Sequence, residues 1–417
     1  MSSTVRLSGA TFGYFGSATS QTDYLSLGNG GMVNTNVIAR TETNTQVTWH
    51  TGGTLTNLCA TVFGGTNNIA ATLKSRIAGG LGNLSITGIN AQGIWEDTTH
   101  SDTVSAGNTV SLQYFNGSQT IISANGWDLF AGGASWTATG DTVNVLITGG
   151  PQTLSTASQT SYVQPGGAFP SSTTQANGEW LVKLPTGVDH ITFRNLYVRV
   201  SANTSTNAIS ISLNGASGSG PAPAVSITGG SGAVNAEDTI HTIQAKDGDK
   251  ISYKIITGAS TVNCTIETIS IEAQSDNNLF HWVAANTAGV DQNGVPAFPT
   301  GPLVGPVATI TGNGTIRLPT ANTTTKISLL SAYVMTPVAS SSLTLQQSGS
   351  NVGSPGNVSV PTTATGWVTD STNTYTVAAT NAFKLAWSAH DFYLCCTALT
   401  FVTTLPSSSN LTMLGVG

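Results

Sequence analysis

The strongest constraint on this chain is that it repeats itself. Residues 84–100 and residues 225–241 align without gaps at an offset of 141 positions (225 minus 84). Both segments contain Ser-Ile-Thr-Gly, then Glu-Asp-Thr and a final His. The same offset aligns residues 107–111 with residues 248–252, and residues 57–62 correspond to residues 195–200. Matches this long, in a constant order, indicate a duplicated folding unit.

A third, weaker copy follows the second. Asn357-Val-Ser-Val360 takes the place of the first strand of the motif, and Asp370-Ser-Thr-Asn373 takes the place of Asp-Thr-x-His. The counterpart of residues 195–200 is Ala332-Tyr-Val334, and residues 380–383 replace the Gly-Asp turn. The second and third copies also share Asn-Gly followed by Leu-Pro-Thr, at residues 177–186 and 313–320. The sequence therefore predicts three units of one fold.

Within a copy, the apolar residues recur with a period of two, as in Ile209-Ser-Ile-Ser-Leu213 and Leu343-Thr-Leu345. This alternation is typical of strands that bury one face. Turn sequences such as Asn214-Gly215 and Asp247-Gly-Asp249 separate the strands. We therefore predict an all-β protein of three tandem antiparallel β-sandwich domains, jelly-roll-like, each with about eight strands.

Composition excludes other classes of protein. Only 8% of the 417 residues are charged, against about 25% in average globular proteins, so exposed helices with charged pairs are disfavoured. No apolar run approaches the roughly 18 residues of a spanning helix, and the even spread of apolar residues opposes disorder. The 13 Lys and Arg form no cluster, which opposes nucleic-acid binding. We expect neither a membrane nor a nucleic acid as partner.

Segments rich in Pro and Gly divide the copies. The sequence predicts a docking arm at 1–28, β-sandwich repeats at 29–150, 176–276 and 307–417, and linkers at 151–175 and 277–306. Dense proline favours extended, semi-rigid linkers. The N-terminus lacks a basic segment followed by an apolar core, so no secretory signal is expected. Cys59, Cys264 and Cys395-Cys396 lack metal spacing and are expected to be reduced and buried.

The best acid–base cluster is Glu96-Asp97-Thr-Thr-His100 with Asp102 nearby, repeated as Glu237-Asp238-Thr-Ile-His241. These groups could share a metal ion or relay a proton. The alternative is a loop leading into a strand, where Asp caps backbone amides and His donates to a carbonyl. We favour the structural alternative, because a catalytic site seldom appears twice in one chain and the third copy keeps only Asp370.

Other candidates for chemistry are also better explained by structure. Asp247-Gly-Asp249 could open a calcium loop, but a hairpin turn fits its equivalents better. Three His pairs lack a nucleophile nearby: Trp49-His50, His281-Trp282 and His390-Asp391. No common hydrolase, zinc-protease or phosphate-binding motif occurs, although a glycosidase with distant carboxylates stays open. We predict no catalytic residue, cofactor or metal site, and a protein that is not an enzyme.

Eight tryptophans raise the question of glycan binding, because exposed tryptophans on sandwiches stack on sugars. Packing in cores and interfaces is the more common role and is expected for each of them: Trp49, Trp95, Trp127, Trp136, Trp180, Trp282, Trp367 and Trp387.

Taken together, the tandem sandwiches, the Gly-Asp turn at residues 247–252, the Ser/Thr/Asn/Gly-rich strands and the Pro-rich linkers resemble virion surface proteins of tailed bacteriophages, namely capsid decoration and fibre proteins. The resemblance covers the whole chain as a style and includes no diagnostic motif. It implies a non-enzymatic protein, often trimeric, that binds the major capsid protein or other virion proteins. It also implies assembly in a host cytoplasm and a place on the outer surface of the virion.

Two functions follow from this resemblance. A decoration protein would lie over the shell, with three related domains as a pseudo-threefold cap. A receptor-binding fibre, spike or carbohydrate-binding adhesin would instead present a site for a host-surface glycan. The sequence favours decoration and leaves the second function as the alternative.

Overall fold

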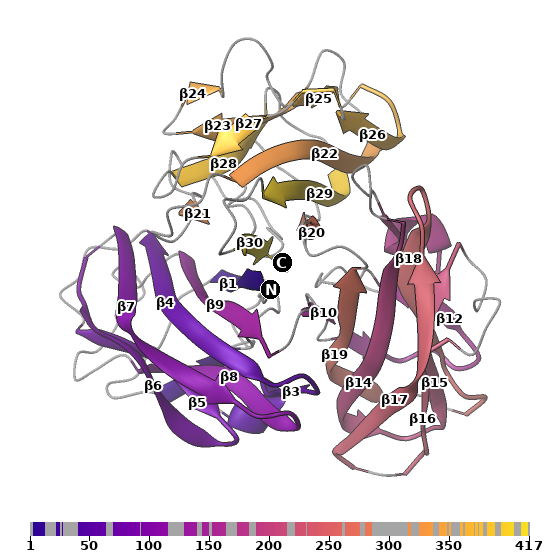
Figure 1. Cartoon of the computed structure of the whole chain (residues 1–417). Helices are drawn as coiled ribbons and strands as arrows, with labels where there is room; N and C mark the ends of the chain where they lie inside the picture. Colours follow the sequence, from indigo (N-terminus) through magenta and orange to yellow (C-terminus); the bar gives the residue numbers. More distant parts are fainter. Residues whose placement is uncertain are drawn as a thin grey trace.

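The fold was examined in a computed structural model of the chain (Figure 1). It describes residues 3–12, 22–25, 27, 41–63, 70–91, 93–115, 129–139, 144–149, 152–163, 173–182, 189–214, 222–230, 232–260, 263–275, 280–285, 316–317, 325–336, 342–347, 350–351, 359–361, 363–370, 372–373, 375–377, 382–387, 393–403 and 410–415. The described residues form strands, turns and two short 3-10 helices, η1 (Glu42–Asn44) and η2 (Gln175–Gly178). The expected all-β class is confirmed, and no described helix is long and apolar enough to cross a membrane.

The first part of the chain forms two facing sheets. Sheet A has the order β30-β1-β9-β4-β7, and sheet B has the order β2-β8-β5-β6 with β3 also paired to β8. The strands are β1 (Ser3–Phe12), β2 (Thr22–Leu25), β3 (Val47–Trp49), β4 (Gly53–Phe63), β5 (Ala71–Ile77), β6 (Gly80–Ile89), β7 (Gly93–Val104), β8 (Asn108–Phe115), β9 (Leu129–Ala138) and, from the far end of the chain, β30 (Asn410–Gly415).

The middle of the chain repeats this arrangement. Sheet C has the order β10-β19-β14-β17 with β11 paired to β19, and sheet D has the order β12-β18-β15-β16 with β13 paired to β18. The strands are β10 (Asn144–Gly149), β11 (Gln152–Leu154), β12 (Thr160–Val163), β13 (Trp180–Leu181), β14 (Ile191–Asn203), β15 (Asn207–Leu213), β16 (Ala224–Ile227), β17 (Val234–Ala245), β18 (Lys250–Ile256) and β19 (Cys264–Ser275).

The last part repeats it again. Sheet E has the order β20-β29-β22-β26 with β27 paired to β22, and sheet F has the order β21-β28-β23-β24 with β25 paired to β23. The strands are β20 (Phe280–Ala285), β21 (Ile316–Arg317), β22 (Thr325–Thr336), β23 (Ser342–Gln347), β24 (Ser350–Asn351), β25 (Ser359–Pro361), β26 (Gly366–Asp370), β27 (Tyr375–Val377), β28 (Ala382–Trp387) and β29 (Tyr393–Thr403).

The strand order identifies each pair of sheets as a jelly roll. When the short extra strands are set aside, each part contributes eight strands. One sheet joins the first, eighth, third and sixth of these strands, and the other joins the second, seventh, fourth and fifth. Figure 1 shows three lobes around the two chain ends. We refer to strands β1–β9, β10–β19 and β20–β29 as the first, second and third jelly rolls.

The core of each jelly roll lies between its two sheets. In β5 and β15 the buried and less buried residues alternate, as the period-two pattern predicted. The largest fully buried side chains are Tyr114, Phe193, Tyr197 and Tyr253. Burial of such side chains supplies the main stabilisation of each sandwich.

The strands cross the boundaries that the sequence predicted. Residues 1–28 were expected to be a docking arm, but β1 and β2 are strands of sheets A and B. Strands β11 and β12 lie in the predicted linker 151–175, and β20 lies in the predicted linker 277–306. Strand β10 belongs to the second jelly roll although residues 144–149 were assigned to the first repeat. These strands sit at or beside sheet edges and are held by backbone pairing, so no repeated side-chain pattern marks them. The number of independently folding domains stays a prediction.

Candidate functional site

The carboxylate–histidine segment of the first jelly roll lies at a bulge in β7. Asp97 is opposite Leu58 on β4, whereas the next paired residue, Ser101, is opposite Thr56. Residues 98–100 are therefore extra residues that loop out of the ladder. A bulge leaves backbone N–H groups without a strand partner, so a nearby acceptor is needed.

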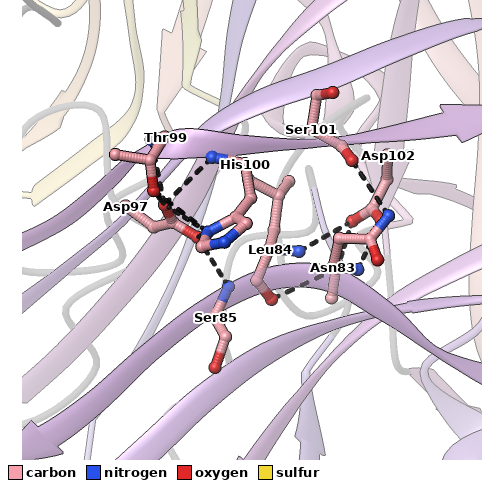
Figure 2. A network of polar contacts seen from close by, with 9 residues as sticks. Asn83, Leu84, Ser85, Asp97, Thr99, His100, Ser101 and Asp102 are labelled. Atoms are coloured by element: carbon pink, nitrogen blue, oxygen red, sulfur yellow. Dashed lines mark hydrogen bonds and ion pairs between the residues drawn. The ribbon is translucent and has the colours of Figure 1, made fainter.

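Asp97 supplies that acceptor. Its side chain accepts hydrogen bonds from the backbone N–H groups of Thr99 (3.0 Å), His100 (3.2 Å) and Ser85 on β6 (2.9 Å). The Thr99 hydroxyl also donates to it at 3.0 Å, and the His100 ring nitrogen Nδ1 lies 2.9 Å from it. Figure 2 shows this network, with Asp97 enclosed by its donors. The carboxylate thus joins β6 to the bulge of β7.

The second jelly roll contains the same arrangement. Asp238 lies opposite Leu196, and residues 239–241 loop out. Its carboxylate accepts from the backbone N–H groups of Ile240 (3.1 Å), His241 (3.1 Å) and Ala224 on β16 (2.8 Å), and the His241 Nδ1 lies 2.8 Å away.

The third jelly roll keeps the arrangement with different residues. Asp370 ends β26 opposite Leu330. It accepts from the backbone N–H groups of Thr372 (3.1 Å) and Asn373 (3.0 Å), and from the Asn373 side-chain amide at 3.0 Å. Asn373 therefore stands where His100 and His241 stand. These contacts confirm the predicted correspondence of the three segments, and we call them the Asp turns.

Charge and burial explain how the Asp turns behave. Burial alone would raise the pKa of Asp97, but the hydrogen bonds from Ser85, Thr99 and His100 outweigh it and lower the pKa to about 2. The same balance lowers the pKa of Asp238 to about 2, through hydrogen bonds from Ala224, His241 and Ile240. Both groups are therefore carboxylates that backbone amides stabilise.

Two details of the predicted structural role need correction. The Asp caps backbone amides as expected, but it does so from within a bulged strand rather than from a loop before one. The histidines contact the Asp carboxylate through Nδ1 instead of donating to a carbonyl. The sequence could not show this, because the ring orientation depends on the looped-out backbone at residues 98–100 and 239–241.

Asp102 has a separate role that its counterpart in the second jelly roll does not share. It is buried and accepts from the backbone N–H groups of Asn83 (2.6 Å) and Leu84 (3.3 Å), and from the Ser75 hydroxyl. These residues join β5, β6 and β7, and Figure 2 shows Asp102 beside Asn83 and Leu84. At the offset of 141 its counterpart is Ile243, which is a buried core residue. Asp102 is thus not part of the repeated cluster.

The predicted turns at Gly107-Asn108 and Asp247-Gly-Asp249 are confirmed. Gly107 and Gly248 both have a φ of 86°, which glycine adopts without steric cost. The Asp249 carboxylate accepts a hydrogen bond from the backbone N–H of Lys246 at 2.7 Å, and the Asn108 side-chain oxygen accepts the equivalent bond from the backbone N–H of Ser105 at 2.9 Å. Asp249 is therefore a turn residue with an amide partner.

A contact that the sequence did not reveal joins the first two jelly rolls. Glu272 on β19 is buried, and its carboxylate accepts from the backbone N–H groups of His50 (3.1 Å) and Thr51 (3.0 Å). The Thr51 hydroxyl and the Asn195 amide donate to it at 3.0 Å and 2.7 Å. The Arg194 guanidinium lies 3.5 Å away. We call this cluster the Glu272 joint.

Further contacts surround the Glu272 joint. The His50 Nε2 atom lies 4.0 Å from a carboxylate oxygen of Glu237, so His50 lies at the interface between the first two jelly rolls. Tyr197 is buried and hydrogen-bonds the Thr48 side chain. Burial raises the pKa of the Tyr197 hydroxyl. The interface therefore combines charged, polar and aromatic groups.

Nothing in one sequence could have identified the Glu272 joint. The register places Ser135 at the equivalent position of β9, because Ser135 faces Thr56 as Glu272 faces Arg194. In the structure, β19 is buried on both faces, including Thr268 and Ser270. Burial of both faces follows from the neighbouring jelly roll and is not encoded in strand periodicity.

The remaining candidates are placed only in part. Trp49 and Trp136 are packed as expected, with ring centroids 4.3 Å apart in an edge-on contact. Trp95 and Trp367 are half-buried, and the Trp95 indole donates to the Ala91 carbonyl at 3.2 Å. His281 and Trp282 lie on β20. The other candidates lie outside the described side chains or residues: Trp127, Trp180, Trp282, Trp387, His281, His390 and Asp391.

Two of the four cysteines, Cys59 and Cys264, lie among the described side chains. Neither Cys59 nor Cys264 forms a disulfide, and Cys59 is half-buried whereas Cys264 is buried. Burial raises the pKa of the Cys264 thiol to about 11. Cys395 and Cys396 lie on β29, and their side chains are outside the described set. Within the ranges described above, no three His, Cys, Asp or Glu side chains are grouped so that they could hold a metal ion.

Comparisons with known proteins include a structural likeness. No protein-family model and no curated protein sequence matches the chain. Among solved structures, the chain is similar to one described as "The Triple Jelly Roll Fold and Turret Assembly in an Archaeal Virus". The sequence identity is 11%, the alignment covers 88% of this chain and 82% of the other, and the TM-score is 0.18. At that TM-score the likeness carries no argument, so the fold assignment rests on the strand order.

Proposed function

We propose that this chain is a non-enzymatic structural protein of a virus particle, carried on the outer surface as a capsid decoration protein. The observation that carries this proposal is the repetition of the Asp turn in three jelly rolls. A carboxylate that in all three jelly rolls accepts hydrogen bonds from the looped-out backbone that follows it serves the fold and is not free to act as a base or a metal ligand.

The Glu272 joint supports a role as a fixed, multi-lobed body. Four donors and one guanidinium converge on a buried carboxylate between the first two jelly rolls. A charge in such a place is stable only when its partners stay in position. A protein that reinforces contacts between shell subunits needs lobes with fixed relative positions, and the three lobes in Figure 1 could each contact a different subunit.

The charge pattern fits an outward-facing position. The chain has 13 Lys and Arg against 19 Asp and Glu, with a net charge of −6 and no basic cluster. It therefore has little attraction for packaged nucleic acid. Its scarcity of charge also limits salt-sensitive contacts, which suits a particle that persists outside cells. The partner we propose is the major capsid protein.

The test compares virus particles with and without this protein. Mass spectrometry or gel densitometry gives the number of copies per particle, and a decoration protein is expected in hundreds. Particles that lack it should disrupt at a lower temperature and still adsorb to the host. Particles of unchanged stability that fail to adsorb would overturn decoration and favour the receptor-binding alternative. Particles that never contain the protein would overturn both.

A further inference from the structure

The C-terminal strand β30 is paired in an unusual way. It lies in parallel beside β1 at the edge of sheet A, with Ser3 opposite Asn410 and Ser8 opposite Gly415. The two partner residues at the start of this pairing are 407 positions apart (410 minus 3). Strand β30 follows the third jelly roll, yet it completes a sheet of the first. Figure 1 places the two chain ends together between the lobes.

Among the described strand pairs, the β1–β30 pair is the one exception to two regularities. Every other pair joins strands of the same jelly roll, and every other pair is antiparallel. Parallel pairing is slightly less stable per residue. In addition, β30 is an edge strand and β1 is its one described hydrogen-bonded partner, so β30 can leave β1 without breaking another described strand pair.

The composition of both strands favours pairing between chains. Strand β30 contains no charged residue, and β1 contains a single one, Arg6. Proteins usually protect exposed edges from pairing with charges or prolines, and neither β1 nor β30 has that protection beyond Arg6. In the described part of the chain, the equivalent edge strands β10 and β20 have no additional hydrogen-bonded strand, although β30 also lies close to β20.

We propose that β30 is an exchangeable strand, which pairs with β1 of its own chain in the free protein and with β1 of a neighbouring copy in the assembled protein. The same six residue pairs form in both cases, so exchange replaces each hydrogen bond with an identical one. Within one chain, β30 is favoured to pair with its own β1 because the two strands are tethered. When copies are crowded on a surface, the effective concentration of a neighbour's β1 rises and offsets this preference. The partner is thus a second copy of this chain. This inference deepens the proposed function and rests on it only for the source of the crowding.

A cysteine experiment on the purified full-length protein tests the exchange. One preparation carries Val5→Cys, and a second, lengthened by an affinity tag, carries Thr412→Cys. Residues 5 and 412 are register partners. After the two are mixed at increasing concentration and mildly oxidised, exchange yields a disulfide-linked pair of unequal chains on a non-reducing gel.

The matched control replaces Thr412→Cys by Gly415→Cys, which lies opposite Ser8 and is out of register with residue 5. We expect about ten-fold less linked product from this control, because a disulfide needs Cα atoms within about 4.4–6.8 Å. The unmodified chain controls for its four natural cysteines. Equal amounts of linked product from the in-register and out-of-register mixtures would overturn the proposal. So would a double variant, with Val5→Cys and Thr412→Cys in one chain, that forms disulfides only within single chains at every concentration.

A second variant tests the same strand without cross-linking. Thr412→Pro removes one backbone N–H from β30 and leaves every other described strand unchanged. At concentrations where Thr412→Val self-associates, sedimentation velocity should show a shift of Thr412→Pro toward single chains, with an unchanged β-sheet circular dichroism spectrum. Undiminished self-association of Thr412→Pro would overturn the exchange. Because these tests use protein without virus, their failure leaves the particle experiment unaffected, and the reverse also holds.

Discussion

The Asp turns and the Glu272 joint use the same chemistry at different distances along the chain. In each, a buried carboxylate accepts hydrogen bonds from backbone amides. Asp97 accepts hydrogen bonds from residues up to three positions after it in the chain and from Ser85. Glu272 takes two of its donors from His50 and Thr51, more than two hundred residues away.

The difference lies in what each cluster stabilises. An Asp turn stabilises one bulge inside one jelly roll, so duplication of the unit duplicated the turn. The Glu272 joint stabilises the position of one jelly roll against the next, and the equivalent position in the first jelly roll is Ser135. Loss of an Asp turn should therefore weaken a single unit, whereas loss of the joint should separate two of them.

The largest effect is expected for Glu272→Ala. This change leaves two backbone N–H groups, an amide and a guanidinium without their acceptor. Removal of one partner of a buried charge cluster costs about 3–5 kcal/mol. Urea unfolding should show the loss, and the transition should split because the first two jelly rolls are no longer coupled.

The matched control is Glu267→Ala on the same strand. Glu267 is half-buried and outside the joint, so its loss should cost less than about 1 kcal/mol. If both variants unfold in one transition with the same midpoint, the joint does not couple the jelly rolls.

The second effect concerns the Asp turns as a set. Asp97→Ala, Asp238→Ala and Asp370→Ala each leave at least two backbone N–H groups of a bulge without an acceptor. The expected cost is about 2–3 kcal/mol for each, and the three values should agree within about 1 kcal/mol because the geometry recurs. Hydrogen exchange should rise at the looped-out residues of the altered jelly roll alone. A cost confined to one of the three variants would contradict the equivalence of the turns.

The third effect is a pH dependence. The pKa of Asp97 and of Asp238 is about 2 in the folded chain, against an ordinary 3.8. Between these values the unfolded chain binds more protons, so the stability is fully present above about pH 4 and is lost as the pH falls toward 2. Each carboxylate should contribute about 2 kcal/mol to this loss. The stability of the double variant Asp97→Asn, Asp238→Asn should fall less steeply over this range, as measured by chemical unfolding. An unchanged slope would show that these two groups do not set it.

How much of this could be predicted from the sequence depends on the range of each contact. Alternating strands, the turns at Gly107 and Gly248, and the substitution of Asn373 for a repeated His all follow from local pattern. The edge strands β1, β10 and β20 were assigned to an arm, a neighbouring repeat and a linker, because backbone pairing defines them and side-chain similarity does not. Glu272 was missed because its backbone donors, His50 and Thr51, come from another jelly roll.

The smallest effect on stability is expected when a residue of one jelly roll is replaced by its counterpart from another jelly roll. In the third jelly roll the Asn373 amide donates to the Asp370 carboxylate at 3.0 Å, where the first uses the ring nitrogen of His100. The His100 side chain is 59% exposed, so its contact with Asp97 is partly screened by water. His100→Asn should therefore change the free energy of unfolding by less than about 0.5 kcal/mol, whereas His100→Ala should cost slightly more because it removes the donor. Differential scanning calorimetry at neutral pH would detect a larger change. A loss as large as that of Asp97→Ala would mean that the imidazole, and not the backbone amides, holds the turn.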